Sequence, residues 1–218
     1  MAEHPLIPRL LLITDRKLTP NLIPALAQAA EGGVDSILVR EKDLDDHEFV
    51  RLCQAIQHAI QHTPTQILLS GRAHLLPHVG AAGVHLPERH RPPLSQVRTL
   101  LGSDKLIGCS CHDLSTARHC CQEGADYITL SPLFATPSHP ETQPLGITTY
   151  SQILKAIPLP VLALGGINVT NASLAMAAGS HGIALIRGIL DKRNPQTHAA
   201  KMASIIDSYR CKKENKKG

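Results

Sequence analysis

The stretch EGADYITL, residues 123–130, joins a glycine at the end of a helical pattern to a short apolar run. The same order recurs as EGGVDSILV (31–39), VGAAGVHL (79–86) and AGSHGIALI (178–186). A helix that stops at glycine and is followed by an apolar strand is typical of proteins with parallel sheets. The recurrence therefore indicates one structural unit repeated along the chain.

Eight short apolar runs alternate with helical patterns, and they are continuous rather than alternating, as in strands covered on both faces. They occupy residues 9–15, 36–41, 66–70, 83–87, 106–110, 127–131, 161–166 and 182–187. Eight such units in 218 residues fit a closed (β/α)₈ TIM barrel. An open doubly wound sheet is the alternative, but the first run ends in LITDRKLTP without a glycine-rich loop. We predict a single α/β barrel over residues 1–211 and a basic disordered tail at 212–218.

Composition restricts the classes of partner. Aromatic residues make up 2% of the chain, so stacking platforms for single-stranded nucleic acid are not available. The net charge of +4 lies largely in the tail CKKENKKG, and nucleic acid is not implied. No apolar run reaches membrane-spanning length, so we expect no membrane partner. The six cysteines lack zinc-knuckle spacing and predict reduced thiols in a cytoplasmic protein, and a homodimer is left open.

Charged residues follow the second predicted strand directly, in SILVREKDL (36–44). TIM barrels carry their active sites at the C-terminal ends of the strands, where these residues would lie. Neighbouring cations are costly together without an anion, so Arg40 and Lys42 are candidates to hold an acidic group. The alternative is a salt bridge from them to Asp15 or Glu41.

Two glycine-containing strand ends predict a phosphate site. ALGGIN places Gly165 and Gly166 after strand seven, and LIRGIL places Arg187 and Gly188 after strand eight. Glycines let backbone N–H groups approach an anion, and these two loops are the common phosphate site of such barrels. A plain turn with a surface arginine is the alternative.

A long loop, SPLFATPSHPETQPLG (131–146), follows strand six. A loop of this length in a compact barrel is usually functional and is often a lid. Thr136 and Ser138 offer hydroxyl donors to a phosphate, and His139 offers an imidazole that titrates near neutral pH.

These motifs together resemble the family of thiamine phosphate synthase and its relative TenI. The resemblance rests on ITDR, LVREKD, GVHL, IGCSCHDLSTA, GADYITLSPLFAT, LALGGIN and GIALIRGI, in this order, over roughly residues 10–190. It implies a TIM barrel of thiamine biosynthesis. The synthase joins hydroxymethylpyrimidine diphosphate to thiazole phosphate with magnesium and releases pyrophosphate, whereas TenI aromatises thiazole phosphate.

The resemblance assigns roles to several positions. It implies that Arg40 and Lys42 grip the diphosphate and that Ser110 lies near the pyrophosphate. It likewise assigns the thiazole phosphate to Thr136, Ser138 and the glycine pair. The candidate substrate-binding residues are thus Arg40, Lys42, Ser70, Ser110, Thr136, Ser138, Gly165, Gly166, Arg187 and Gly188.

Several positions depart from the synthase pattern. The pyrimidine-reading Gln is replaced by Leu38, and the two magnesium-binding Asp residues are replaced by Gly71 and His90. Magnesium prefers hard oxygen ligands, so we predict no metal site, with magnesium required only if synthase activity is retained. His139 replaces the loop lysine of the synthase, and Pro132 replaces the catalytic His of TenI.

Three functions remain open from the sequence. The first is a TenI-like protein acting on thiazole phosphate with a degraded magnesium and pyrimidine diphosphate site. The second is a divergent thiamine phosphate synthase, and the third is a non-catalytic barrel that binds a phosphorylated ligand and regulates. The candidate catalytic residues are His139, Lys42 and His112, of which the two histidines are candidate proton shuttles.

Overall fold

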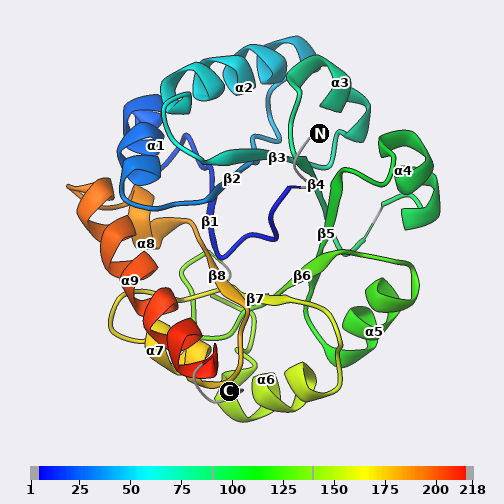
Figure 1. The fold of residues 1–218 in the computed structure, drawn as a ribbon, viewed down its shortest axis with the longest axis vertical. Coiled ribbons are helices and arrows are strands. Elements are labelled where there is room, and N and C mark those ends of the chain that lie inside the picture. The colour runs from blue at the N-terminus through cyan, green and yellow to red at the C-terminus, as the bar shows by residue number, and fades with distance from the viewer. Residues whose placement is uncertain (1–4, 90, 139, 215–218) are drawn as a thin grey trace.

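The protein, in a computed structural model that describes residues 5–89, 91–138 and 140–214, is a closed barrel of eight parallel strands. Each strand pairs with the next along the chain, and β8 pairs with β1 to close the ring (Figure 1). The predicted TIM barrel is confirmed. The strands are β1 (Leu10–Ile13), β2 (Ser36–Val39), β3 (Gln66–Ser70), β4 (Gly83–Leu86), β5 (Leu106–Cys111), β6 (Tyr127–Leu130), β7 (Val161–Ala163) and β8 (Gly182–Leu185).

Helices surround the ring of strands on its outside (Figure 1). Among the described residues, none of these helices is long and apolar enough to cross a bilayer. The helices are α1 (Leu22–Glu31), α2 (Asp46–Ile60), α3 (Leu76–Val79), preceded by a 3₁₀ turn at Ala73–Leu75, α4 (Leu94–Leu101), α5 (Leu114–Gln122), α6 (Gly146–Lys155), α7 (Ala172–Ala177), α8 (Arg187–Leu190) and α9 (Pro195–Glu214).

The C-terminal helix α9 is longer than the sequence pattern predicts. It continues to Glu214, past the expected end of the barrel at residue 211. The first three residues of the predicted tail are therefore helical, and residues 215–218 lie outside the described part of the chain.

Strand residues alternate between two apolar cores, because successive side chains of a strand point to opposite faces. The outer core lies between the strands and the helices and is much the larger of the two. The inner core fills the barrel beneath its C-terminal mouth. Its buried members are Leu11, Ile13, Leu38, Leu68, Leu106, Tyr127, Leu162 and Ala184.

Capping boxes start two of the helices directly after strand ends that carry candidate site residues. The Asp45 carboxylate accepts from Glu48 N at 2.8 Å at the start of α2, and the Glu48 side chain accepts from Asp45 N. Asp113 accepts from Thr116 N at 2.8 Å at the start of α5. Such caps stabilise a helix by about 1 kcal/mol each. They also fix where the loops after β2 and β5 must end.

The six cysteines are all free and form no disulfide among themselves. Cys109, Cys111 and Cys120 are buried between β5 and α5, where the Cys111 and Cys120 sulfur atoms lie 3.6 Å apart. They belong to the outer core and not to the mouth of the barrel.

Candidate active site

The loop after β2 separates its charges between the mouth and the interior. Glu41 turns inward, with its side chain 4% exposed, and accepts from Arg16 N at 3.1 Å. Its carboxylate also lies 3.5 Å from the Arg16 guanidinium, and burial raises its pKa. Thr14 Oγ1 accepts from Arg40 N at 2.9 Å, which anchors the strand end. The predicted alternative of a salt bridge from Arg40 to Glu41 is therefore wrong, since Arg16 takes that role.

Arg40 and Lys42 keep their charges available. Arg40 is half-buried and lies two residues beyond Leu38, whose side chain belongs to the inner core, so it continues the inward face at the mouth. Lys42 is exposed. Within the described chain, neither side chain forms an ion pair. The arrangement leaves two cations at the end of β2 available to an external anion.

Arg72, in the loop after β3, ties this loop to the neighbouring one. Its guanidinium lies 4.5 Å from the Phe49 ring centroid, 2.7 Å from the Asp46 carboxylate and against the Leu44 carbonyl oxygen. Arg72 adopts a left-handed φ of 43°, a backbone conformation that is strained for a residue other than glycine. Ser70, at the end of β3, is half-buried and lies opposite His85 in the strand register. Arg72 thus supports the segment that follows Arg40 and Lys42 instead of facing the mouth.

A polar network crosses β4, β5 and β6 just below the mouth. His85 is buried, and its Nδ1 lies 3.1 Å from the Tyr127 hydroxyl. Its Nε2 lies 3.1 Å from Ser110 Oγ and 3.3 Å from Thr129 Oγ1. Tyr127 fits because Gly108 faces its ring, where an added Cβ would lie 2.2 Å from a ring atom. Ser110 is half-buried, unlike the other three members of the network, and lies one residue before the end of β5.

Burial of His85 predicts a loss of stability in acid. Burial lowers the pKa of His85 to about 4, so the unfolded chain takes up a proton below its ordinary value of 6.5 while the native chain does not. Stability should therefore fall as the pH drops from 6.5 toward 4 and should be unaffected by this group above 6.5. Urea unfolding near pH 4.5 and 7 should show a pH-dependent loss about 2 kcal/mol larger than in His85→Gln. Equal losses in the two proteins would contradict the assignment.

His112 lies at the end of β5 with 48% of its side chain exposed. Its Nδ1 lies 2.7 Å from the Ser131 carbonyl oxygen, and because a carbonyl only accepts, Nδ1 carries the proton. In the neutral ring Nε2 is then the acceptor, and it lies 3.9 Å from the Glu88 carboxylate. His112 therefore presents a basic nitrogen at the mouth, as a proton shuttle requires.

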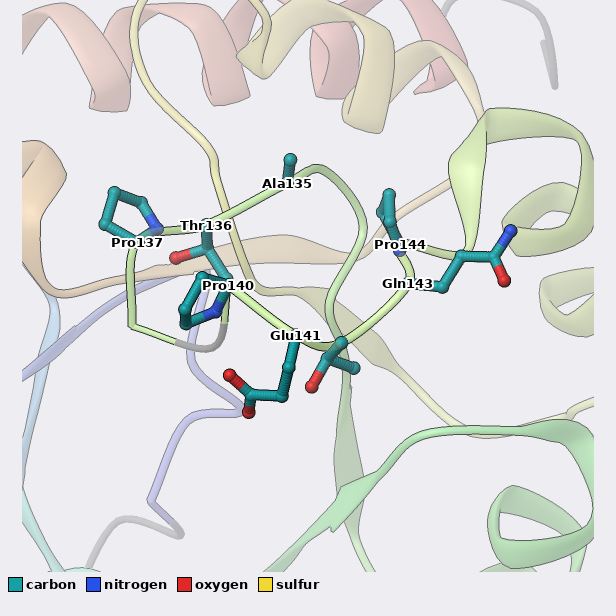
Figure 2. Close-up of a pocket in the computed structure, with 8 residues that line it drawn as sticks. Ala135, Thr136, Pro137, Pro140, Glu141, Gln143 and Pro144 are labelled. Atoms are coloured by element: carbon teal, nitrogen blue, oxygen red, sulfur yellow. The ribbon is translucent and has the colours of Figure 1, made fainter.

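The loop after β6 borders a hollow of about 560 Å³ (Figure 2). Thr136 lines it, and Ser138 N lies 3.4 Å from the Thr136 hydroxyl. Figure 2 shows Gln143 pointing away from the hollow, with Thr136 near Pro137 and Pro140. The lining residues are Ala135, Thr136, Pro137, Pro140, Glu141, Thr142, Gln143 and Pro144. His139 lies outside the described residues, so its predicted role as a proton shuttle stays a prediction.

The glycine pair after β7 is the surface on which this loop docks. Phe134 N donates to the Gly165 carbonyl oxygen at 3.1 Å. An added Cβ at Gly165 would lie 2.7 Å from Pro132 Cα, and one at Gly166 would lie 2.3 Å from the Ala135 carbonyl oxygen. Both residues also have positive φ values, 97° and 66°. Glycine is required here by close contact with the loop as well as by backbone conformation.

The same segment offers backbone donors to a ligand. Within the described residues, the N–H groups of Gly165, Gly166 and Gly188 have no acceptor. An added Cβ at Gly188 would lie 3.1 Å from the Ile167 carbonyl oxygen, so the loops after β7 and β8 meet. Arg187 is exposed beside Gly188. The phosphate site stays a prediction, but its candidate residues lie in two loops that meet and that carry amide donors and a cation.

Asn171 holds the glycine loop in place. Its side chain accepts from Asn168 N at 2.8 Å and donates to the Gly166 carbonyl oxygen at 2.9 Å. Although Asn171 directly precedes α7, its side chain makes no capping bond to this helix. The sequence around Asn171 does not distinguish an asparagine that bonds the preceding loop from one that caps the helix, because both stand at the start of a helix.

The described residues at the magnesium positions of the resemblance offer few hard oxygen ligands. Gly71 has no side chain to offer, and no group of three or more His, Cys, Asp or Glu side chains in the described chain is placed to hold a metal ion. Glu88 supplies one carboxylate, which lies 3.9 Å from the Arg89 guanidinium. His90 lies outside the described residues. No step of the chemistry below is therefore assigned to a metal.

The site also contains residues that sequence patterns did not single out as functional. Glu41, Tyr127 and Thr129 lie in continuous apolar or charged runs in which nothing marks the inward-facing positions. Only strand register, which places Ser110 opposite Thr129 and Ser70 opposite His85, shows that they meet.

Comparisons with known proteins agree with the fold. The sequence profile described as thiamine monophosphate synthase matches residues 10–189. The thiamine-phosphate synthase of Vibrio parahaemolyticus is 35% identical over 91% of this chain and 98% of its own length, and that of Syntrophomonas wolfei is 32% identical over 90% and 95%. The structure of thiamine phosphate pyrophosphorylase from Pyrococcus furiosus superimposes with a TM-score of 0.83 at 25% identity, covering 92% of this chain and 96% of that one.

Proposed function

Because the chain belongs to the thiamine monophosphate synthase family, we propose that it is a thiamine-phosphate synthase. In this reaction the thiazole nitrogen attacks the methylene carbon of hydroxymethylpyrimidine diphosphate. A C–N bond forms, the C–O bond to the diphosphate breaks, and pyrophosphate leaves. The names of the relatives favour this activity over the tautomerase expected from the sequence departures, and the matched profile extends over the whole barrel.

The observation that carries the proposal is that anion-binding groups occur in two separate sets around one mouth. One set lies on β2 and β5, with the unpaired cations Arg40 and Lys42 and the Ser110 hydroxyl. The other lies after β6, β7 and β8, with the Thr136 loop and the free amides of the glycines. Coupling a diphosphate to a monophosphate requires two such sets, whereas isomerising one monophosphate requires one.

The residues then have distinct roles. Arg40 and Lys42 bind the diphosphate and stabilise the charge that develops as it leaves, and Ser110 donates to the same group. Ser70 lies beside them at the end of β3. Thr136, Ser138, Gly165, Gly166, Arg187 and Gly188 bind the thiazole phosphate. Holding both substrates in this way brings the thiazole nitrogen to the methylene carbon and removes the entropy cost of their encounter.

A thiazole tautomerase is the second candidate, and the geometry of His112 favours it. Its Nδ1–H donates to the Ser131 carbonyl oxygen, which leaves Nε2 as a half-exposed base at the mouth. Leu38 occupies the position at which the synthase pattern has a Gln that binds the pyrimidine. Its apolar side chain belongs to the inner core.

A coupled pair of assays tests the proposal. The protein is incubated with both substrates, with magnesium and with a chelator, and thiamine phosphate and pyrophosphate are measured; omission of either substrate is the control. Separately, thiazole phosphate alone is incubated in heavy water to detect deuterium exchange. We expect equal amounts of thiamine phosphate and pyrophosphate in the first assay. Deuterium exchange without pyrophosphate release would establish the tautomerase, and binding without either reaction would establish a non-catalytic barrel.

A further inference from the structure

Three buried sulfur atoms gather between β5 and α5, in the outer core and away from the mouth. Cys109 and Cys111 are two residues apart on β5, so their side chains leave the same face of the strand. Cys120, on α5, lies against them, and its sulfur atom is 3.6 Å from that of Cys111. A disulfide has an S–S distance of about 2.05 Å, so these two sulfur atoms need to approach by about 1.5 Å. A side-chain movement of this size would bring them to bonding distance.

Arg91, from the loop after β4, places its guanidinium against the same cluster. The side chain is 8% exposed, and its Nη2 donates to the Glu123 carboxylate and lies 3.6 Å from Cys120 Sγ. Its Nε is buried and has no hydrogen-bond partner among the described residues. A buried guanidinium with an unmet N–H is stabilised by negative charge beyond that of a single carboxylate. Cys120, which contacts the guanidinium, can supply this charge as a thiolate.

The three thiols hold their protons unequally. Hydrogen bonds from the Cys109 and Cys111 thiols keep the pKa of Cys120 well below its ordinary value of 9.0. The charge of Arg91 acts in the same direction, and burial acts against both. The hydrogen bond to Cys120, together with burial, raises the pKa of the two thiols on β5. The thiolate is the nucleophilic form of cysteine, so Cys120 has the properties of an attacking sulfur and Cys111 those of a protonated partner beside it.

The cluster lies close to solvent although its sulfur atoms are buried. The His119 ring is exposed and lies 3.3 Å from the Glu123 carboxylate, which is itself 21% exposed. Glu123 in turn contacts Arg91, and Arg91 contacts Cys120, so a row of polar groups leads from the surface to the thiolate. Arg91 belongs to no helix or strand. Its side chain can therefore move aside without disturbing β5 or α5 and admit a small oxidant.

We propose that Cys120 and Cys111 form an oxidation site, at which a small hydroperoxide such as hydrogen peroxide converts the two thiols into a disulfide. The Cys120 thiolate attacks one peroxide oxygen, so that an S–O bond forms, the O–O bond breaks, and hydroxide leaves and takes a proton from solvent. The Cys111 sulfur then attacks the Cys120 sulfenic acid. An S–S bond forms, the S–O bond breaks, and the hydroxyl leaves as water with the Cys111 proton. Two electrons pass from the sulfur pair to the peroxide, and neither step depends on the proposed synthase activity.

Peptide mapping of the unaltered, folded protein tests the proposal. The protein is treated with hydrogen peroxide in the presence of a chelator, alkylated under denaturing conditions, and digested with trypsin from the monomer band of a non-reducing gel. Cleavage after Arg118 separates a peptide that contains Cys109 and Cys111 from one that contains Cys120 and Cys121. We expect mass spectrometry to find these two peptides joined by a disulfide after peroxide treatment and separate without it. Separate peptides after treatment would overturn the proposal.

The order of oxidation distinguishes a thiolate from cysteines that only fill the core. Exposure alone would make Cys211, which is exposed, and Cys121, which is half-buried, the first thiols to react. We expect the Cys111–Cys120 pair to be oxidised about tenfold faster than Cys211, as followed by the fraction of each cysteine that remains open to alkylation over time. Faster oxidation of Cys211 than of the pair would overturn the proposal.

Single alanine variants assign the bond to its two sulfur atoms. Cys120→Ala and Cys111→Ala should each abolish the joined peptides. Cys121→Ala and Cys109→Ala are the matched controls, because each removes the other thiol of the same peptide, and both should retain the joined peptides. Joined peptides in Cys120→Ala or Cys111→Ala, or their loss from either control, would overturn the assignment to this pair. The map and the order of oxidation in the unaltered protein test the site even where a variant fails to fold.

Discussion

Arg40→Ala is expected to lower kcat/KM for thiamine phosphate formation about 10²- to 10³-fold, because a diphosphate leaving group then loses a preorganised cation. The guanidinium is half-buried at the end of β2, and no carboxylate in the described chain neutralises it. Its charge therefore acts on an external anion. The loss should fall mainly on kcat/KM for the pyrimidine diphosphate, with a smaller effect on the affinity for thiazole phosphate.

The stability of this variant provides an internal check. Since Arg40 forms no ion pair within the described residues, its removal should change the free energy of unfolding by no more than about 0.5 kcal/mol. Arg51→Ala, on the exposed face of α2, removes the same charge away from the mouth and should leave kcat/KM unchanged. If Arg40→Ala and Arg51→Ala had the same activity, Arg40 would have no role in the reaction.

Gly166→Ala is expected to lower kcat/KM about 10²-fold, because the added methyl group displaces the loop that binds the thiazole phosphate. The new Cβ would lie 2.3 Å from the Ala135 carbonyl oxygen and 2.8 Å from Phe134 Cβ. Both belong to the docked loop, so the loop has to move away from β7. The displacement also moves Thr136, which immediately follows Ala135.

Gly146→Ala is the matched control for backbone strain. Gly146 has a φ of 67°, nearly the same as the 66° of Gly166, but an added Cβ there meets nothing within 4 Å. Both variants should lose about 1–2 kcal/mol of stability from the left-handed conformation. Only Gly166→Ala should also lose activity. Comparable activities for the two variants, measured with thermal unfolding alongside, would show that loop contact at Gly166 is unimportant.

The barrel could be predicted because short sequence patterns mark each of its repeated helix and strand units. A glycine such as Gly124 ends each helix pattern, and continuous apolar runs such as Tyr127–Leu130 mark strands covered on both faces. These signals depend on backbone conformation and burial, which act within a few residues. The predicted ends of helices were less accurate. For example, α9 continues to Glu214, past the predicted end of the barrel at residue 211.

The site could be predicted only in part. Arg40 and the glycine pair stand at strand ends, where barrels bind ligands, so the sequence could select them as candidates, and their roles stay predictions. The contact of Glu41 with Arg16 could not be predicted. It depends on which of three successive charged residues meets a partner in the loop after β1. The second role of Gly165 and Gly166, contact with residues 132–135, depends on a loop whose path no local pattern specifies.

The inner core beneath the mouth has a consequence for the order in which reactants bind and products leave. Eight buried side chains close the interior, so ligands can reach the network at Ser110 only from the C-terminal face. Both reactants and both products must then share a single opening. A ligand held against Ser110 sits deeper than one held by residues 135–138, and it has to arrive first and depart last. Steady-state kinetics of such an arrangement are ordered rather than random, and the deeper product competes with the deeper reactant, because both bind the free protein.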